Sequence, residues 1–165
     1  MRTQHSITVP LPQAEVFAFL SNVANEVSWR KSIVGSRYVG ADSPQVGVAG
    51  ETDVAMGKKA LTMKWAIIRF EPGSHVAWQL DGGPWRGGGS YTVVPSDGQS
   101  VIRAALEVKL RGIARLLEPL VWLQLRLGLR GDLRSLAGEL LQTQRNNTTR
   151  ISTRRRFESQ LQPNT

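Results

Sequence analysis

The chain has 165 residues, of which 41% are hydrophobic, and it carries a formal net charge of +8 without a single cysteine. A chain of this length can bury roughly 70% of its unfolded surface, so one domain can form without a metal or disulfide staple. The absence of cysteine excludes thiol nucleophiles, disulfides and cysteine-ligated zinc. Because no segment has the pattern of a signal peptide or a membrane-spanning helix, we expect a cytoplasmic protein.

The positive charge is unevenly distributed along the sequence. Residues 143–165 contain five arginines and one glutamate, a net charge of +4, and residues 1–142 carry the other +4. The polar composition after Arg145 predicts a folded domain over 1–145 and a disordered basic tail over 146–165. The tail lacks interleaved aromatic residues, so no specific nucleic-acid binding is predicted, and contact with an acidic membrane remains a lesser alternative.

The first thirty residues predict one strand and two short helices. A strand beginning at Ser6 ends at Pro10 and Pro12, since proline donates no hydrogen bond to a sheet. Helical spacing of apolar residues follows in QAEVFAFLSNV (13–23), with proline favoured in its first turn. A second short helix is predicted in ANEVSW (24–29).

Six strand-like segments follow, separated by turns rich in Gly, Pro, Asp and Ser. Several of the turns are short enough for hairpins, which predicts an antiparallel sheet. A break in the alternation of apolar residues after Ile67 predicts a β-bulge near Ile68 and Arg69. The predicted strands cover residues 32–39, 50–56, 60–71, 75–80, 90–94 and 99–110.

A long apolar segment from Gly112 to Arg145 predicts the main helix. Its leucines form two ridges, one through Trp122, Leu125, Leu129, Leu133, Leu136 and Leu140 and one through Leu116, Leu120, Leu123, Leu127 and Leu141. Residues 121–129 also alternate with the period of a strand, but the length and flanking pattern of the segment favour a helix. Gly128, Gly131 and Asp132 fall on the side that we expect to face water.

This order of elements resembles the START-like superfamily of helix-grip proteins, also called SRPBCC or polyketide cyclase/dehydrase-like. The resemblance covers about residues 5–142 and rests on ITVPLPQAEVFAFLSNVANEVSW (7–29), RFEPGSHVAW (69–78), GGSYTVVPSDGQSVI (88–102) and DLRSLAGEL (132–140). It implies an α+β fold with a curved antiparallel sheet of six to seven strands wrapped around one long C-terminal helix. It also implies a cavity between sheet and helix that takes apolar ligands, and it carries over no catalytic residue.

The cavity is expected to be lined by apolar and aromatic side chains from the sheet and the helix. Arg126 and Arg130 lie between the two leucine ridges and are predicted as polar contacts to a ligand. They turn outward instead if the helix bends at Gly128 or Gly131. The proposed wall residues are Trp65, Trp78, Tyr91, Ile102, Leu106, Leu120, Leu123 and Leu127.

Other chemistry-bearing residues give weaker signals. His5 and His75 lack the spacing of metal ligands, so neither a metal site nor a cofactor is predicted. The glycine cluster DGGPWRGGG (81–89) lacks the following helix of a phosphate loop. A twisted strand start or a mobile hairpin, with Trp85 as an entrance gate, fits better. Asp53 and Glu107 fall on the polar face of their strands, where partners such as Lys64 or Arg103 are expected.

These patterns lead to three hypotheses about function. The first is a binding protein that carries an apolar small molecule, with an acidic group on the ligand as one option. The second is an enzyme of the cyclase/dehydratase kind acting on an aromatic or polyketide-type substrate. The third is docking of the helix or the basic tail on a partner or membrane surface. The sequence contains no signal for oligomeric state.

Overall fold

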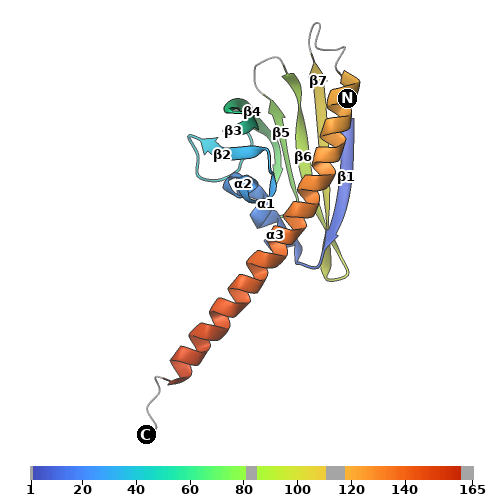
Figure 1. Ribbon diagram of the computed structural model, residues 1–165. Coiled ribbons are helices and arrows are strands. Elements are labelled where there is room, and N and C mark those ends of the chain that lie inside the picture. Colours follow the sequence, from blue (N-terminus) through green and yellow to red (C-terminus); the bar gives the residue numbers. More distant parts are fainter. Residues whose placement is uncertain (1, 81–84, 111–117, 161–165) are drawn as a thin grey trace.

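A computed structural model gives the fold of residues 2–80, 85–110 and 118–160. A strand is followed by three short helical segments, six further strands and one long helix, the order that the sequence predicts (Figure 1). The elements are β1 (Arg2–Val9), α1 (Gln13–Ser21), η1 (Val23–Asn25), α2 (Glu26–Trp29), β2 (Ile33–Val39), β3 (Ala49–Met56), β4 (Lys59–Glu71), β5 (His75–Leu80), β6 (Trp85–Ser96), β7 (Gln99–Leu110) and α3 (Glu118–Gln160).

The strands form one seven-stranded antiparallel sheet in the order β1-β7-β6-β5-β4-β3-β2. The sheet curves, and α3 runs diagonally across it and contacts β1, β7 and α2 (Figure 1). This arrangement confirms the predicted helix-grip fold. The register between β4 and β5 shifts between Ile67 and Arg69, which confirms the bulge predicted from the break in alternation.

Strand β6 begins earlier than the sequence predicts. Gly87, Gly88 and Gly89 pair with β5 or β7 as part of the strand, so they form its start rather than a hairpin loop. A Cβ atom on Gly88 would lie 2.1 Å from the carbonyl oxygen of Trp78, which explains why glycine fits this strand. Residues 81–84 and the side chain of Trp85 lie outside the described residues, and so does the suggested gate.

The core is formed by inward side chains of the sheet, α1 and one ridge of α3. On α3 the ridge residues Leu129, Leu133, Leu136 and Leu140 are buried, with exposed fractions of 0–5%. Leu123 and Leu127 of the second ridge are 47% and 59% exposed. Among the side chains that the structure describes, the helix packs on the sheet mainly through the first ridge, and Leu141 of the second ridge is partly buried.

Helix α3 differs from its prediction at both ends. It is described from Glu118, while residues 111–117 lie outside the described residues. It continues to Gln160, so the structure corrects the expectation of disorder for residues 146–160. A helix satisfies its backbone hydrogen bonds internally, so it can extend past the sheet without a core beneath it (Figure 1). Among the described helices, none combines the length and the hydrophobicity needed to cross a membrane.

Candidate functional site: a cavity with one charged end

A cavity of about 530 Å³ lies between the sheet, α2 and α3. This volume is within the range of sites that hold small organic molecules. Most of its wall is aliphatic or aromatic, and its charged side chains come from α2, the residue that follows α2, and α3. The lining residues include Val54, Met63, Trp65, Ile67, Val76, Trp78, Leu80, Tyr91, Leu106 and Leu129 as well as Glu26, Arg30 and Asp132.

Two tryptophans on the sheet are held in place by glycines opposite them. A Cβ atom on Gly50 would lie 2.2 Å from the ring of Trp65, and one on Gly89 would lie 2.5 Å from the ring of Trp78. Glycine at these positions lets each indole lie flat against the neighbouring strand. The aromatic part of the cavity wall therefore depends on two residues that have no side chain.

Trp65 is further fixed by a hydrogen bond to an inward hydroxyl. Its Nε1 donates to Oγ1 of Thr52 at 2.9 Å, and Thr52 shares a second hydrogen bond with Ser36 at 3.0 Å. The ring of Tyr38 packs edge-on against Trp65, and the Tyr38 hydroxyl donates to the carbonyl of Ser21 at 2.6 Å. Desolvation by burial raises the pKa of Tyr38 to about 12, so this phenol stays neutral at physiological pH.

The charged end of the cavity is centred on Arg30, the residue that ends α2. Its Nη1 donates to Oε1 of Glu26, one helical turn earlier, at 3.1 Å. Its Nε lies 3.5 Å from Oδ2 of Asp132 on α3. The side chains of Glu26, Arg30 and Asp132 are 11%, 22% and 23% exposed. These ion pairs join two helices that are distant in sequence and place three charges on the wall of an apolar cavity.

Tyr91 on β6 lies beside this charged cluster. Its ring contacts Trp29 edge-on at 6.1 Å and Trp78 at 4.9 Å, and the residue is only 5% exposed. Burial raises the pKa of its hydroxyl, which therefore stays protonated. Among the described residues, no hydrogen bond of the Tyr91 hydroxyl is found, and no fully buried side-chain oxygen lacks a partner. The hydroxyl of this cavity-lining residue can therefore donate to a molecule in the cavity.

Asp132 is an acidic group of the cluster with an altered titration. Desolvation raises its pKa above the ordinary aspartate value, and the nearby Arg30 guanidinium opposes that rise. A carboxyl group with a raised pKa gives up its proton less readily than a surface aspartate. The cavity wall thus holds two groups, Asp132 and Tyr91, that can move or donate protons.

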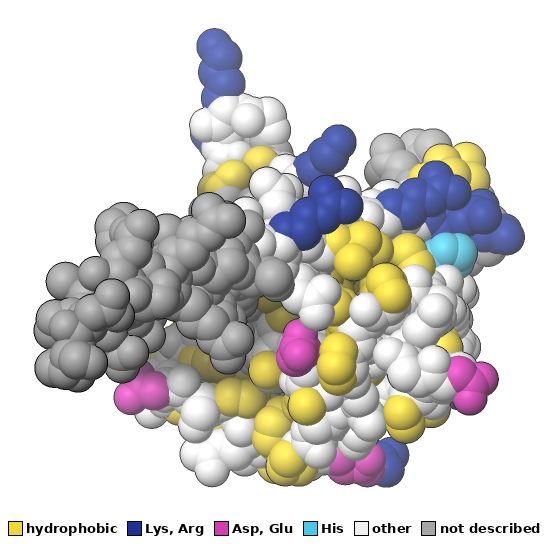
Figure 2. Space-filling view, turned by 90° about the horizontal axis from the view of Figure 1, so that it is seen from below, with side chains coloured by type: hydrophobic (Ala, Val, Ile, Leu, Met, Phe, Trp, Pro, Cys, Tyr) yellow, Lys and Arg dark blue, Asp and Glu magenta, His cyan; other side chains and the backbone are white. Residues whose placement is uncertain are grey.

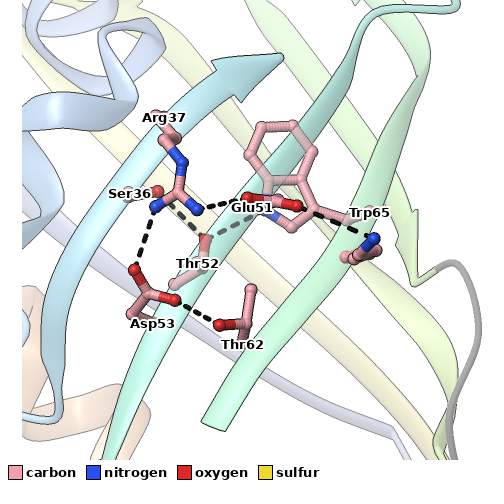
Figure 3. A network of polar contacts seen from close by, with 8 residues as sticks. Ser36, Arg37, Glu51, Thr52, Asp53, Thr62 and Trp65 are labelled. Carbon is pink, nitrogen blue, oxygen red and sulfur yellow. Dashed lines mark hydrogen bonds and ion pairs between the residues drawn. The ribbon is translucent and has the colours of Figure 1, made fainter. Parts of the chain in front are cut away.

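Polar side chains on the outer face of β2, β3 and β4 form a separate network (Figure 3). Arg37 donates to Asp53 at 3.0 Å and also pairs with Glu51, while the Thr62 hydroxyl donates to Asp53 at 2.6 Å. Glu51 also pairs with Lys64 at 3.8 Å. The hydrogen bonds from Thr62 and Arg37 lower the pKa of Asp53. This network joins three strands across the surface and does not reach the cavity.

The predicted wall residues occupy three different environments. Trp65, Trp78, Tyr91 and Leu106 line the cavity together. Ile102 is fully buried and belongs to the packed core instead of the cavity wall. Leu123 and Leu127 are exposed outside the cavity, because they belong to the ridge that faces away from the sheet. The side chain of Leu120 lies outside the described residues.

Arg126 and Arg130 are exposed and do not line the cavity. The structure therefore corrects their prediction as ligand contacts. The helix is continuous through Gly128 and Gly131. They lie on the outer side of α3 with Arg134, and burial together with these arginines lowers the pKa of His5. Figure 2 shows most Lys and Arg side chains gathered on one side of the face viewed from below.

The expected solvent side of α3 is correct for its glycines and needs correction at Asp132. Gly128 and Gly131 are exposed, although Gly128 also borders the cavity. Asp132 lines the cavity, and its side chain is only 23% exposed. A cavity that is partly open to solvent tolerates a carboxylate where a packed core would not, so the helical pattern alone does not show that Asp132 faces inward. Of the two strand carboxylates, Asp53 pairs with Arg37 instead of Lys64, and Glu107 pairs with Lys109 at 3.2 Å instead of Arg103.

Sequence reasoning missed the three charged residues of the cavity. The i, i+4 spacing of Glu26 and Arg30 at the short second helix predicts an ion pair between them. Such pairs are common on protein surfaces, so the spacing does not place this one in a cavity. Nothing local shows that Asp132 approaches them, because that contact depends on how α3 crosses the sheet. Among the described residues, no group of three or more His, Asp or Glu side chains has an arrangement that could hold a metal ion.

The site is thus a cavity of a helix-grip protein, apolar along most of its length and charged at one end. The sequence profile of the family described as polyketide cyclase/dehydrase and lipid transport matches residues 1–142, and the chain belongs to this family. No curated protein gives a significant match.

Solved structures with the same fold come from several organisms. The protein TTHA0849 from Thermus thermophilus matches with a TM-score of 0.74 at 13% identity, over 87% of this chain and 99% of its own. The Zhui aromatase/cyclase from Streptomyces sp. R1128 matches with a TM-score of 0.65 at 15% identity, over 85% and 93%. A START superfamily protein from Mycobacterium smegmatis matches with a TM-score of 0.66 at 13% identity, over 86% and 98%. At these identities the likeness shows the fold alone.

Proposed function

We propose that this protein binds and carries an apolar small molecule in the cavity between the sheet and α3. The observation that carries the proposal is the cavity itself, about 530 Å³ with a wall made mainly of Trp, Leu, Val, Ile and Met side chains. Transfer of apolar surface from water to such a wall is favourable by roughly 25 cal/mol per Å². The family description, which includes lipid transport, agrees with this role.

Binding of a neutral fluorescent probe tests the proposal. N-phenyl-1-naphthylamine should bind with increased fluorescence, and organic extraction of the purified protein followed by mass spectrometry should identify a co-purified ligand. Replacing Leu106 on the cavity wall with Trp should reduce probe binding, because the larger side chain occupies the cavity. The matched control is Ile68→Trp, since Ile68 is 56% exposed and outside the cavity. Equal probe binding by both variants would refute the proposal.

A second candidate function is a cyclase or dehydratase, and the presence of Asp132 and Tyr91 on the cavity wall favours it. In such an enzyme the cavity orients a flexible substrate, and a positioned acid or base exchanges a proton with it. Asp132 has the raised pKa that suits a general acid, and Arg30 beside it can stabilise a developing negative charge on oxygen.

Dehydration of a β-hydroxy thioester tests the second candidate. The protein should convert the thioester to its unsaturated form with loss of one water, followed by mass spectrometry. Asp132→Asn should slow this conversion by about a hundredfold or more, in line with the loss of a general acid. Glu107→Gln, which changes an outward carboxylate, serves as the control. No conversion above the uncatalysed rate would leave carriage as the function.

A further inference from the structure

The charges on the cavity wall indicate which charge a bound ligand can have. Of the described residues that line it, only Glu26, Arg30 and Asp132 have ionisable side chains that are charged near neutral pH. Two carboxylates and one guanidinium give a formal sum of −1. The other polar lining groups are uncharged: hydroxyls such as those of Tyr38, Thr52 and Tyr91, and the indole N–H groups of Trp65 and Trp78.

The single cation in this set is already held by both anions. Arg30 donates to Glu26 at 3.1 Å and lies 3.5 Å from Asp132. An anionic ligand would have to compete with two fixed carboxylates for this guanidinium while lying close to their charge. Like charges repel more strongly beside a mainly apolar wall than in bulk water.

A ligand with a neutral oxygen avoids this repulsion and finds hydrogen-bond partners on the cavity wall. Tyr91 is a buried residue that lines the cavity beside the cluster, and its hydroxyl can donate a hydrogen bond. A ligand hydroxyl can in turn donate to Asp132, or accept from it when that carboxyl is protonated. Asp132 can therefore form a hydrogen bond with a neutral oxygen in either protonation state. The summed charge of Glu26, Arg30 and Asp132 is not positive in either state.

We infer that the cavity selects apolar ligands whose polar end is a neutral oxygen function, a hydroxyl or a carbonyl, and discriminates against carboxylates. The inference rests on the proposed binding function and reverses the expectation of an acidic ligand. That expectation depended on Arg126 and Arg130, which are exposed outside the cavity. The selecting residues are instead Glu26, Arg30, Asp132 and Tyr91.

Competition between two matched ligands tests the inference. Bound N-phenyl-1-naphthylamine is displaced with decanol and, separately, with decanoate at neutral pH. Decanol should have an affinity at least about tenfold higher, the ratio expected for one unmatched like charge near the site. In Asp132→Asn, where the formal sum becomes zero, the preference for decanol should fall severalfold. The control Glu107→Gln removes a carboxylate on the outer face and should leave the preference unchanged.

The outcomes separate the inference from the function on which it rests. If the probe itself fails to bind the wild-type protein, the proposed function fails. If the probe binds and decanoate displaces it as well as or better than decanol, the inference is overturned while the binding function stands. The same holds if Asp132→Asn and Glu107→Gln change the preference equally.

Discussion

At the scale of single residues, Arg30 pairs with two partly buried carboxylates at once. Its guanidinium pairs with Glu26 within the α2 segment and with Asp132 on α3. Removing one member of a buried ion pair costs about 3–5 kcal/mol, because the remaining charge is left uncompensated. The structural role of Arg30 can therefore be measured apart from ligand binding.

We predict that Arg30→Met lowers the free energy of unfolding by roughly 2–3 kcal/mol, below the range for fully dry pairs because the cavity admits some water. The loss should be smaller at acidic pH, where the two carboxyls can take up protons. Urea unfolding at neutral and acidic pH measures both effects. Arg69→Met is the matched control, since Arg69 and Glu71 form an exposed pair, and there we expect a change of about 0–1 kcal/mol. Equal losses in both variants would contradict the role of Arg30.

A second residue-scale prediction concerns the pH dependence of stability. The pKa of Asp132 is raised in the folded state, so the folded protein holds this proton more tightly than the unfolded chain. Its contribution to stability is therefore largest at low pH and declines as pH rises from the unfolded value of about 3.9 through the folded pKa. Asp132→Asn removes that decline. The stability of the variant relative to wild type should rise with pH across this window, and a constant difference would contradict the prediction.

These residues also show where sequence reasoning stops. Trp65, Trp78 and Tyr91 could be placed on the inner face of the sheet because strand alternation fixes the side on which each lies. Arg30 and Asp132 are separated by about a hundred positions, and their contact depends on the crossing of α3 over the sheet. A local pattern contains no information about that crossing, so the charged end of the cavity could not be predicted.

At the scale of elements, the close contact of β3 with the Trp65 side chain of β4 depends on Gly50. A Cβ atom at this position would overlap the indole ring, so the ring or the strand would have to shift. We predict that Gly50→Ala costs about 1–3 kcal/mol of stability, the usual penalty of overpacking. It should also alter Trp fluorescence, because the hydrogen bond from Trp65 to Thr52 would be disturbed.

A glycine on α3 gives the matched control. Nothing lies within 4 Å of a Cβ atom added at Gly131, and this residue is exposed in the interior of the helix. Gly131→Ala should therefore raise stability by about 1 kcal/mol, since alanine favours helix. Chemical denaturation of both variants compares them directly, and opposite signs are expected. A loss of stability in both would contradict the assigned role of Gly50.

The far half of α3 provides another element-scale prediction. Leu140 is the last buried residue of the helix among those whose side chains are described. The C-terminal part of α3 projects past the sheet (Figure 1). Deleting residues 146–165 should change the unfolding free energy by less than about 1 kcal/mol, because this segment contains few apolar residues. Leu136→Ala should cost about 2–5 kcal/mol. A large loss on truncation would show that the folded domain extends beyond residue 145.

The sequence predicted the strands and most of their bounds closely, but it did not predict which face of α3 is buried. Strand alternation and turn residues predicted β5 and β7 with their observed bounds, and the phase break predicted the bulge after Ile67. The two leucine ridges of α3 were equally apolar in sequence, yet Leu133 and Leu136 of the first are buried while Leu123 and Leu127 of the second are exposed. A cavity beside Asp132 weakens the usual relation between hydrophobicity and burial, so the pattern could not identify the inner face.

At the scale of the whole molecule, the cavity is formed by parts of the chain that are far apart in the sequence. Its wall combines the α2 segment with strands β2 to β7 and the middle of α3. A ligand that fills it contacts all of these elements at once. Because the ligand binds only the folded state, its binding free energy is added to the stability of the domain.

We therefore predict that a saturating neutral ligand stabilises the protein as a unit. At a free decanol concentration of a hundred times its dissociation constant, the unfolding free energy should rise by about 2.7 kcal/mol. Amide hydrogen exchange should slow in α2 and around Asp132 as well as in β4 to β6, since all of them line the cavity. In Leu106→Trp the stabilisation and the protection should disappear together. Protection confined to the exposed ridge of α3 around Leu123 and Leu127 would instead place the ligand on the outside of the helix.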